Sequence, residues 1–319
     1  MSEDAKPRLF KTFPAYKDYL WGGERLKKEY NKNTELGIVA ESWELSTHPD
    51  GESYMGGEPL SQFIVKNDRL LGCKESKKDI PILIKLIDAK ERLSVQVHPD
   101  DDYASTHEED NGKTEAWVIM DCIPGAYVYY GVIRKITKEE FKQRIQAGTI
   151  EEVLRKVYVK KGDVLLINPG TIHAIGAGIL LCEIQQKSNV TYRIYDFDRI
   201  GNDGNKRELH IDKACETSKL EPNLLNTDPE IILCKNDEFI IECLSKTNYF
   251  SIYRYTVCRE VKIGLTTQLF HALTILNGSC LIQASNESYQ CVQGETIFLP
   301  ASAADIVVNG ACGFILSSI

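Results

Sequence analysis

Two polar side chains interrupt an apolar stretch of the sequence, LSVQVHPDDDYA, which begins at Leu93. Because successive side chains of an extended chain point to opposite faces, Gln96 and His98 share one face, and Val95 and Val97 share the other. An imidazole nitrogen and an amide oxygen can both bind a metal ion. The spacing therefore predicts a short strand that presents a matched polar pair, with metal binding as the chemistry to test.

The elements that must position this pair are mostly strands. Short runs rich in β-branched residues and bounded by turn residues recur along the chain: IPILIKLIDA, EAWVIMDC, AYVYYGVI, DVLLINPG, ILLCEIQQ and VTYRIYDF, and later EFIIECLS, FSIYRYTV, HALTILNGS, SCLIQAS and ETIFLP. Their spacing is typical of an antiparallel sandwich or barrel. The fold class is therefore predicted to be mainly β.

One segment, ITKEEFKQRIQAGTIEEVLRKVYV, departs from the strand pattern. Thr137 and Glu140 have the spacing of a capping box, and apolar residues follow at roughly helical intervals. This predicts two short helices separated near Gly148. A further helix is expected in EPLSQFIVKN, near the start of the chain.

The sequence also indicates two domains. From Gly201 to about Pro229 it is polar and rich in Asn, Asp and Gly, which predicts a connecting segment. KKGDVLLINPGTIHAIGAG and VQGETIFLPASAADIVVNG echo each other, although the second copy has no histidine where the first has His173. We therefore expect a catalytic, metal-binding domain at residues 1–215, with a helical insertion near 137–157, and a degenerate β domain at residues 216–319.

Composition limits the functional class. Of 319 residues, 43% are hydrophobic and 26% charged, which is typical of a soluble globular protein. The ten cysteines include no CxxC pair, and neither a membrane-spanning run nor a secretion signal is evident, so a cytoplasmic location is expected. The net charge of −8 argues against nucleic acid or an anionic membrane as partner. An anionic substrate would need a local basic patch, and the oligomeric state stays open.

The segment GDVLLINPGTIH, which ends at His173, resembles the second signature of the cupin superfamily. In the usual first signature, two histidines and a glutamate precede it. Gln96, His98 and Glu115 offer a comparable set in the same order, with Gln96 in place of the first histidine. The resemblance implies two cupin-like jelly-roll β-barrels with a small helical insertion, and a metal site on the inner wall of the first.

The proposed donor set does not select one metal. Two imidazoles, one carboxylate and one amide oxygen suit Zn²⁺. The same groups could hold ferrous iron or manganese, because two histidines and one carboxylate also form the open site of iron oxygenases. A lone strand histidine is more often a satisfied core residue than a ligand. The prediction therefore depends on all four groups occurring in order.

Longer motifs narrow the family. WGGERL, AESWELSTHPDG, LIKLIDAKERLSVQVHPDD, GKTEAWVI, NPGTIHAIGAG and EIQQKSNVTYRIYDFDR together resemble the type I mannose-6-phosphate isomerases, in their shorter bacterial form, from about Trp21 to Asp212. That family interconverts mannose 6-phosphate and fructose 6-phosphate with bound zinc. The resemblance implies a small-molecule sugar phosphate as partner, and one zinc ion per subunit held by Gln96, His98, Glu115 and His173.

The resemblance also implies that Arg193 is the active-site arginine, that Lys113 lies in the same site, and that Lys85 is a further substrate-binding candidate. Aldose–ketose isomerisation moves a proton from carbon 2 to carbon 1 through an enediol. Because arginine is effectively never deprotonated, Arg193 is expected to stabilise the enediolate or to bind phosphate. Lys113 beside a dication should lose its proton more readily, which makes it a candidate base, with metal-bound water as competitor.

Two other functional classes fit the same residues. A cupin oxygenase or epimerase would use the same ligands on another small molecule, and the oxygenase would consume oxygen. A non-catalytic sugar-phosphate-binding cupin would bind without turnover. Individual residues also have ordinary structural interpretations, since Lys113 could be a solvated loop lysine and Arg193 a strand charge paired with Asp196 or Asp198.

Overall fold

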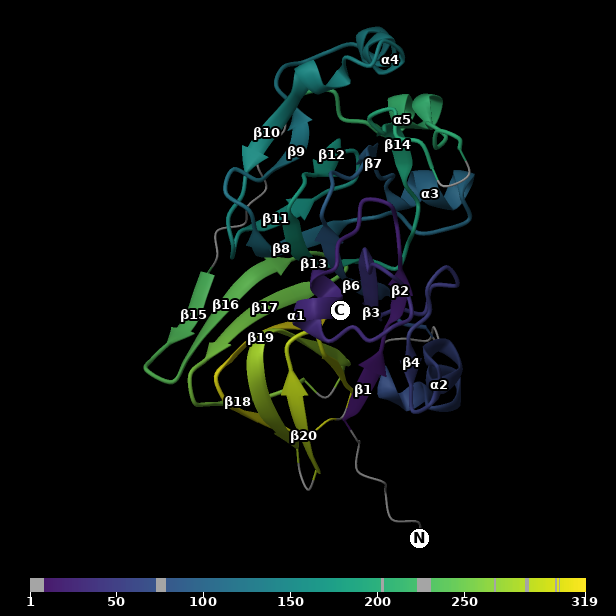
Figure 1. The fold of residues 1–319 in the computed structure, drawn as a ribbon. Coiled ribbons are helices and arrows are strands. Elements are labelled where there is room, and N and C mark those ends of the chain that lie inside the picture. The colour runs from purple at the N-terminus through teal and green to yellow at the C-terminus, as the bar shows by residue number, and fades with distance from the viewer. Residues whose placement is uncertain are drawn as a thin grey trace.

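The computed structural model describes residues 9–72, 79–201, 204–222, 231–266, 268–284, 287–301, 303 and 305–319. Strands dominate these residues, which confirms the mainly-β prediction, and they form three sheets (Figure 1). The six-stranded sheet has the order β11-β8-β13-β6-β3-β2, and the five-stranded sheet the order β10-β9-β12-β7-β14. Closure of the sheets into two jelly-roll barrels stays a prediction.

The first two sheets are built from the N-terminal two thirds of the chain. The six-stranded sheet contains β2 (Ala15–Lys17), β3 (Glu41–Leu45), β6 (Ile82–Ala89), β8 (Glu115–Cys122), β11 (Val164–Ile167) and β13 (Ile179–Gln186). The five-stranded sheet contains β7 (Val95–Val97), β9 (Tyr127–Val132), β10 (Leu154–Tyr158), β12 (His173–Ile175) and β14 (Tyr192–Tyr195). Apolar side chains from both sheets, including Ile87, Trp117, Val128 and Ile175, pack in one buried cluster. The candidate site belongs to this layer.

All eight residues of β6 are buried, because both faces of the six-stranded sheet are covered. Ile82, Ile84 and Leu86 belong to a cluster that also contains side chains of the C-terminal part, such as Phe250. The alternate residues, among them Lys85, point to the layer between the two sheets. Strand alternation therefore places a buried lysine in an otherwise apolar strand.

The third sheet has twelve strands and holds the C-terminal part of the chain, drawn in green and yellow in Figure 1. Its members are β1 (Phe10–Phe13), β4 (Tyr54–Met55), β5 (Glu58–Pro59), β15 (Ile231–Lys235), β16 (Phe239–Lys246), β17 (Ser251–Val257), β18 (Glu260–Ile263), β19 (His271–Ala284), β20 (Glu287–Val292), β21 (Thr296–Leu299), β22 (Ile306–Asn309) and β23 (Cys312–Ser318). HALTILNGS and SCLIQAS, expected as two strands, form the single strand β19. It is irregular near Gly278, where φ is +75°.

Five α-helices occur in the described residues: α1 (Arg25–Tyr30), α2 (Leu60–Lys66), α3 (Asp101–His107), α4 (Lys138–Gln146) and α5 (Ile211–Thr217). Two 3₁₀ helices are η1 (Asp68–Leu70) and η2 (Ile150–Val153). The helix expected in EPLSQFIVKN is α2. Thr137 caps α4 by accepting from the Glu140 amide at 3.1 Å, as its capping-box position predicts. The second expected helix is the 3₁₀ helix η2, and strand β10 follows it directly.

Helices α4 and α5 cover the outer face of the five-stranded sheet, where Phe141 and Ala214 pack against Val97 and Ile194. Helix α5 lies in the segment expected to connect two domains and crosses the predicted boundary between residues 215 and 216. Residues 202–203 and 223–229 of that segment lie outside the described part of the chain. The boundary itself stays a prediction. Among the described helices, none is long and apolar enough to cross a bilayer.

Candidate metal centre and active-site cavity

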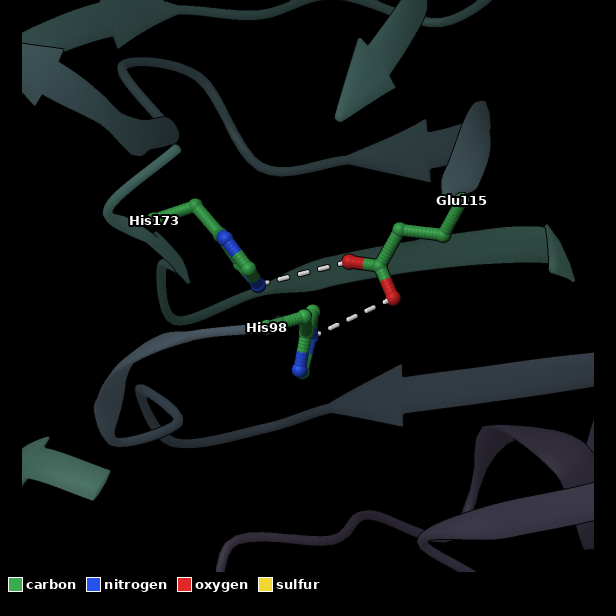
Figure 2. A group of neighbouring side chains, drawn as sticks. All are labelled: His98, Glu115 and His173. Atoms are coloured by element: carbon green, nitrogen blue, oxygen red, sulfur yellow. Dashed lines mark ion pairs between the residues drawn. The ribbon is translucent and has the colours of Figure 1, made fainter. Parts of the chain in front are cut away.

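Three of the four predicted metal ligands converge in the layer between the two N-terminal sheets. His98 follows β7, Glu115 begins β8 and His173 begins β12. Glu115 Oε2 lies 3.5 Å from His98 Nε2, and Glu115 Oε1 lies 3.3 Å from His173 Nε2. Figure 2 shows both imidazoles directed at this carboxylate. The group is buried, and its ligand atoms lie within 4.8 Å of one another.

Hydrogen bonds to the backbone orient both imidazoles. His98 Nδ1 lies 2.8 Å from the Val190 carbonyl oxygen, and His173 Nδ1 lies 2.8 Å from the Thr171 carbonyl oxygen. A carbonyl can only accept, so each Nδ1 carries the proton and each Nε2 directs a lone pair into the group. Burial, followed by the charge of Lys113, lowers the pKa of His98 to about 3. Burial also lowers the pKa of His173. Both rings are therefore neutral, the form that binds metals.

Glu115 supplies the negative charge of this group. Burial disfavours its ionised form, but neighbouring groups, with the charge of Lys113 foremost, outweigh that effect, so the pKa of Glu115 lies well below its usual range. Lys113 Nζ is 2.8 Å from Glu115 Oε2, yet neither carboxylate oxygen accepts a hydrogen bond of good geometry from a described residue. A buried carboxylate beside two neutral imidazoles, with ligand atoms within 4.8 Å of one another, fits a divalent cation.

Gln96, the fourth predicted ligand, lies beside this group. It is the direct partner of His173 on the antiparallel pair β7–β12, and its Nε2 atom is 3.3 Å from His173 Nε2. The side-chain amide donates a hydrogen bond in this orientation. Rotation of the amide by half a turn would present its oxygen instead. Gln96 therefore lies next to the ligand group, and its role as a ligand stays a prediction.

A second polar row lies on the facing sheet. Trp117, Glu183, Lys85 and Trp43 are successive cross-strand partners on β8, β13, β6 and β3. Lys85 Nζ lies 3.5 Å from Glu183 Oε1 and 3.6 Å from Glu41 Oε2. Burial alone would lower the pKa of Lys85, and the nearby carboxylates raise it above its usual value. Lys85 is therefore a buried ammonium ion.

The two tryptophans orient the carboxylates of this row. Trp117 Nε1 donates to Glu183 Oε2 at 2.8 Å, and Trp43 Nε1 donates to Glu41 Oε2 at 2.7 Å. Burial, followed by the charge of Glu115, raises the pKa of Glu183. Sequence reasoning missed Glu183 as a functional residue. Its only local signal is an acidic residue inside the apolar strand ILLCEIQQ.

Arg193, on β14, lies directly opposite Gln96 on β7. Its Nε atom is buried without an acceptor among the described residues, and its Nη1 donates to the Glu208 carbonyl at 3.0 Å. The alternative pairing with Asp196 is not seen, because Arg207 holds that carboxylate at 2.6 and 2.8 Å. Arg193 is therefore available to a ligand.

These residues surround a cavity of about 260 Å³ between the sheets. Of the predicted site residues, Lys85, Gln96, Lys113 and Arg193 line it, together with the unpredicted Glu41, Glu183 and Arg207. The buried ligand group joins the cavity through Lys113, whose Nζ is 3.2 Å from His98 Nε2. Three larger hollows, of about 310, 420 and 710 Å³, lie elsewhere, and no member of the ligand group lines any of them.

Comparison with known proteins identifies the family. Residues 9–116 match the catalytic-domain model of type I phosphomannose isomerase, and residues 240–319 match the cupin-domain model of mannose-6-phosphate isomerase. A protein of Bacillus subtilis named as a probable mannose-6-phosphate isomerase is 37% identical over 95% of this chain and 97% of its own length. The chain belongs to the type I phosphomannose isomerase family.

Other relatives agree with this membership. The mannose-6-phosphate isomerase of Streptococcus mutans is 36% identical to this type I family member over 88% of this chain and 89% of its own. The crystal structure of a mannose 6-phosphate isomerase from Bacillus subtilis superposes with a TM-score of 0.91 at 32% identity, covering 98% of this chain and 99% of that one. The similarity includes the C-terminal part, where the sequence motifs are weak.

Proposed function

We propose that this type I family member interconverts mannose 6-phosphate and fructose 6-phosphate through an enediol intermediate. The observation that carries the proposal is the buried group of His98, Glu115 and His173 beside a cavity lined by cationic side chains. Relatives that match nearly the whole chain are named for this activity.

We infer that the group holds one zinc ion per subunit, with Gln96 turned to offer its amide oxygen as the fourth ligand. Two neutral imidazoles and an ionised carboxylate, which accepts no hydrogen bond of good geometry from a described residue, support this assignment. When bound, the cation supplies Lewis-acid stabilisation of negative charge on the sugar oxygens. The Nδ1 contacts of His98 and His173 hold the ligands in the orientation that binding requires.

The cationic residues of the chain have separate proposed roles. The guanidinium Nε of Arg193 has no acceptor among the described residues, which suits Arg193 to an enediolate oxygen or the phosphate. Lys113 reaches both His98 and Glu115, and we assign it to proton transfer between carbons 2 and 1 of the sugar. Lys85 is held between two carboxylates, which suits it to orienting sugar hydroxyls rather than to accepting a proton.

We also propose a two-domain architecture and a cytoplasmic location for the enzyme. Two facing N-terminal sheets and a C-terminal match to a cupin-domain model support two jelly-roll domains, at residues 1–215 and 216–319. Cysteine composition supports a cytoplasmic enzyme. Its proposed partner is the small sugar phosphate alone, without nucleic acid or membrane.

One experiment tests the central proposal. The purified protein is analysed for bound metals, and conversion of mannose 6-phosphate is followed before chelation, after chelation and after zinc is restored. We expect about one zinc per chain, activity lost with the metal and activity regained with zinc. Full activity in metal-free protein would refute the metal-dependent mechanism. Oxygen consumption would identify an oxygenase. Binding of the sugar phosphate without turnover would identify a non-catalytic protein.

Isotope exchange then tests the enediol. Proton transfer through a base that exchanges with solvent introduces deuterium at carbon 2 of the mannose 6-phosphate pool in heavy water. Transfer of hydride between the two carbons would leave both unlabelled. We expect incorporation, and its complete absence over many turnovers would contradict the enediol.

A further inference from the structure

The lysines of the active-site cavity are compensated by nearby carboxylates. Lys85 lies 3.6 and 3.5 Å from Glu41 and Glu183, and Lys113 lies 2.8 Å from Glu115. At this part of the cavity the three carboxylates outnumber the two ammonium groups. A doubly charged anion therefore gains little from the lysines alone.

Among the arginines of the same cavity, positive charges outnumber the nearby carboxylates. Arg193 and Arg207 both line the cavity, and the buried carboxylate of Asp196 is engaged by Arg207 alone of the two, through Nε and Nη2. Arg193 has no ion-pair partner among the described residues, and its Nε is buried without an acceptor. No described residue accepts from Nη1 of Arg207. This end of the cavity has an excess positive charge and unused N–H donors.

The backbone holds these two arginines side by side. The Arg193 amide donates to His210 Nδ1 at 3.0 Å, and the His210 amide donates to the Arg193 carbonyl at 2.8 Å. These bonds attach the segment that carries Arg207 to strand β14. Phe197 and Asp198 have φ of +56° and +54°, a conformation that is costly for non-glycine residues. The strained turn follows Asp196 directly, so the fold keeps that carboxylate in place at a local cost.

Asp196 has a further support on its other side. Arg199 lies 4.0 Å from Asp196, and its Nη2 donates to the Arg92 carbonyl. The guanidinium of Arg92 stacks on the Phe197 ring, 3.4 Å from its centroid. The Asp196–Arg207 fork is therefore part of a built support and not an isolated surface ion pair.

We propose that Arg207, oriented by Asp196, joins Arg193 to form the phosphate subsite and selects phosphorylated over neutral sugars. This inference rests on the proposed function. The order of partners on β12, β7 and β14 is His173, Gln96 and Arg193, so the subsite lies two strand spacings, about 10 Å, from the ligand group. That separation is comparable to the reach of an open-chain hexose 6-phosphate from carbon 2 to its phosphate.

Two substitutions at Arg207 test the subsite. Arg207→Ala removes the guanidinium, and Arg207→Lys keeps a charge without the planar fork. For Arg207→Ala we expect KM for mannose 6-phosphate and the inhibition constant of inorganic phosphate to rise together, by about tenfold or more, with kcat largely retained. Arg207→Lys should show a smaller rise in both. Asp196→Asn, which removes the orienting charge, should raise KM in the same way.

Lys206→Gln is the matched control. Lys206 precedes Arg207, is exposed, pairs with Asp198 and does not line this cavity. Its substitution removes one positive charge from the same segment, so an equal rise in KM would attribute the effect to general electrostatics and overturn the proposal. Unchanged KM and phosphate inhibition in a folded Arg207→Lys or Arg207→Ala protein would overturn it as well.

Calorimetric titration with inorganic phosphate separates this inference from the proposed function. It reports anion binding without turnover. If the unsubstituted protein binds phosphate through Arg207 but converts no mannose 6-phosphate, the subsite stands and the proposed function fails. If the protein is an active isomerase and phosphate binding does not depend on Arg207, the subsite fails alone.

Discussion

Gln96 stands between His173 and Arg193 as the direct cross-strand partner of both. The side chains of such partners lie on the same face of a sheet and in contact range. Gln96 therefore joins the ligand group to the arginine end of the cavity. A change at this position should reveal whether metal binding and sugar binding are coupled through one residue.

The first prediction concerns Gln96 as a ligand. Loss of a residue that supports a metal site lowers metal affinity by about 10- to 100-fold, and we expect at least this fall in zinc affinity for Gln96→Ala. For His98→Ala we expect a larger fall, because imidazole is the stronger zinc donor. Zinc content during titration with a chelator of known affinity measures both. Gln143→Ala, on the exposed face of α4, is the control. Unchanged zinc affinity in Gln96→Ala would remove Gln96 from the ligand set.

The ligand group could be predicted from sequence, and the facing wall could not. Gln96 and His98 interrupt an apolar strand at a spacing of two, and His173 ends a recognisable turn-and-strand motif, so each has a local signal. Glu183 and Lys85 become neighbours only through the register of β13 against β6, strands about a hundred residues apart. No local periodicity specifies that register, since it depends on which faces are buried.

The second prediction concerns Lys113. Lys113→Arg keeps a positive charge beside Glu115 but replaces an amine that can exchange a proton with a group that cannot. We expect turnover to fall by about 100-fold or more, as for loss of a general acid–base group, with zinc content unchanged. Steady-state kinetics and metal analysis measure the two effects. Lys161→Arg, at an exposed position, should be neutral, and retained turnover in Lys113→Arg would exclude Lys113 as the base.

The third prediction concerns a buried ion pair behind the site. Lys32 Nζ lies 2.6 Å from Glu44 Oε1, both side chains are at most 5% exposed, and Lys32 also donates to the Gly294 carbonyl. Lys32→Met would leave the buried Glu44 carboxyl group without its cationic partner. We expect the free energy of unfolding to fall by about 3–5 kcal/mol, measured by denaturant titration. A second substitution, Glu44→Gln in the Lys32→Met background, should recover part of this loss. Equal stability of Lys32→Met and the unsubstituted protein would contradict the prediction.

The sequence echo between the two β regions has a structural counterpart that explains why only one region keeps its chemistry. Ile167 and Leu299 occupy matching positions in the two echoed segments. Ile167, on β11, pairs with Glu115 on β8, and Leu299, on β21, pairs with His271 on β19. His271 is buried, and its Nδ1 has no hydrogen-bond partner among the described residues. Among the described residues, no metal-type group forms around His271, which is therefore a core residue that burial keeps neutral.

The last prediction follows from that burial. Burial lowers the pKa of His271 from 6.5 to about 4. Between these values the unfolded chain binds a proton at this residue and the folded chain does not, so stability is full above pH 6.5 and falls as the pH drops towards 4. When the pH is lowered from 6.5 to 4, we expect the free energy of unfolding to fall by about 2–3 kcal/mol less in His271→Leu than in the unsubstituted protein. Denaturant unfolding at a series of pH values measures the difference, with His107→Gln, at an exposed position, as the control. Parallel stability curves for His271→Leu and the unsubstituted protein would show that His271 is not the group whose protonation opposes folding in acid.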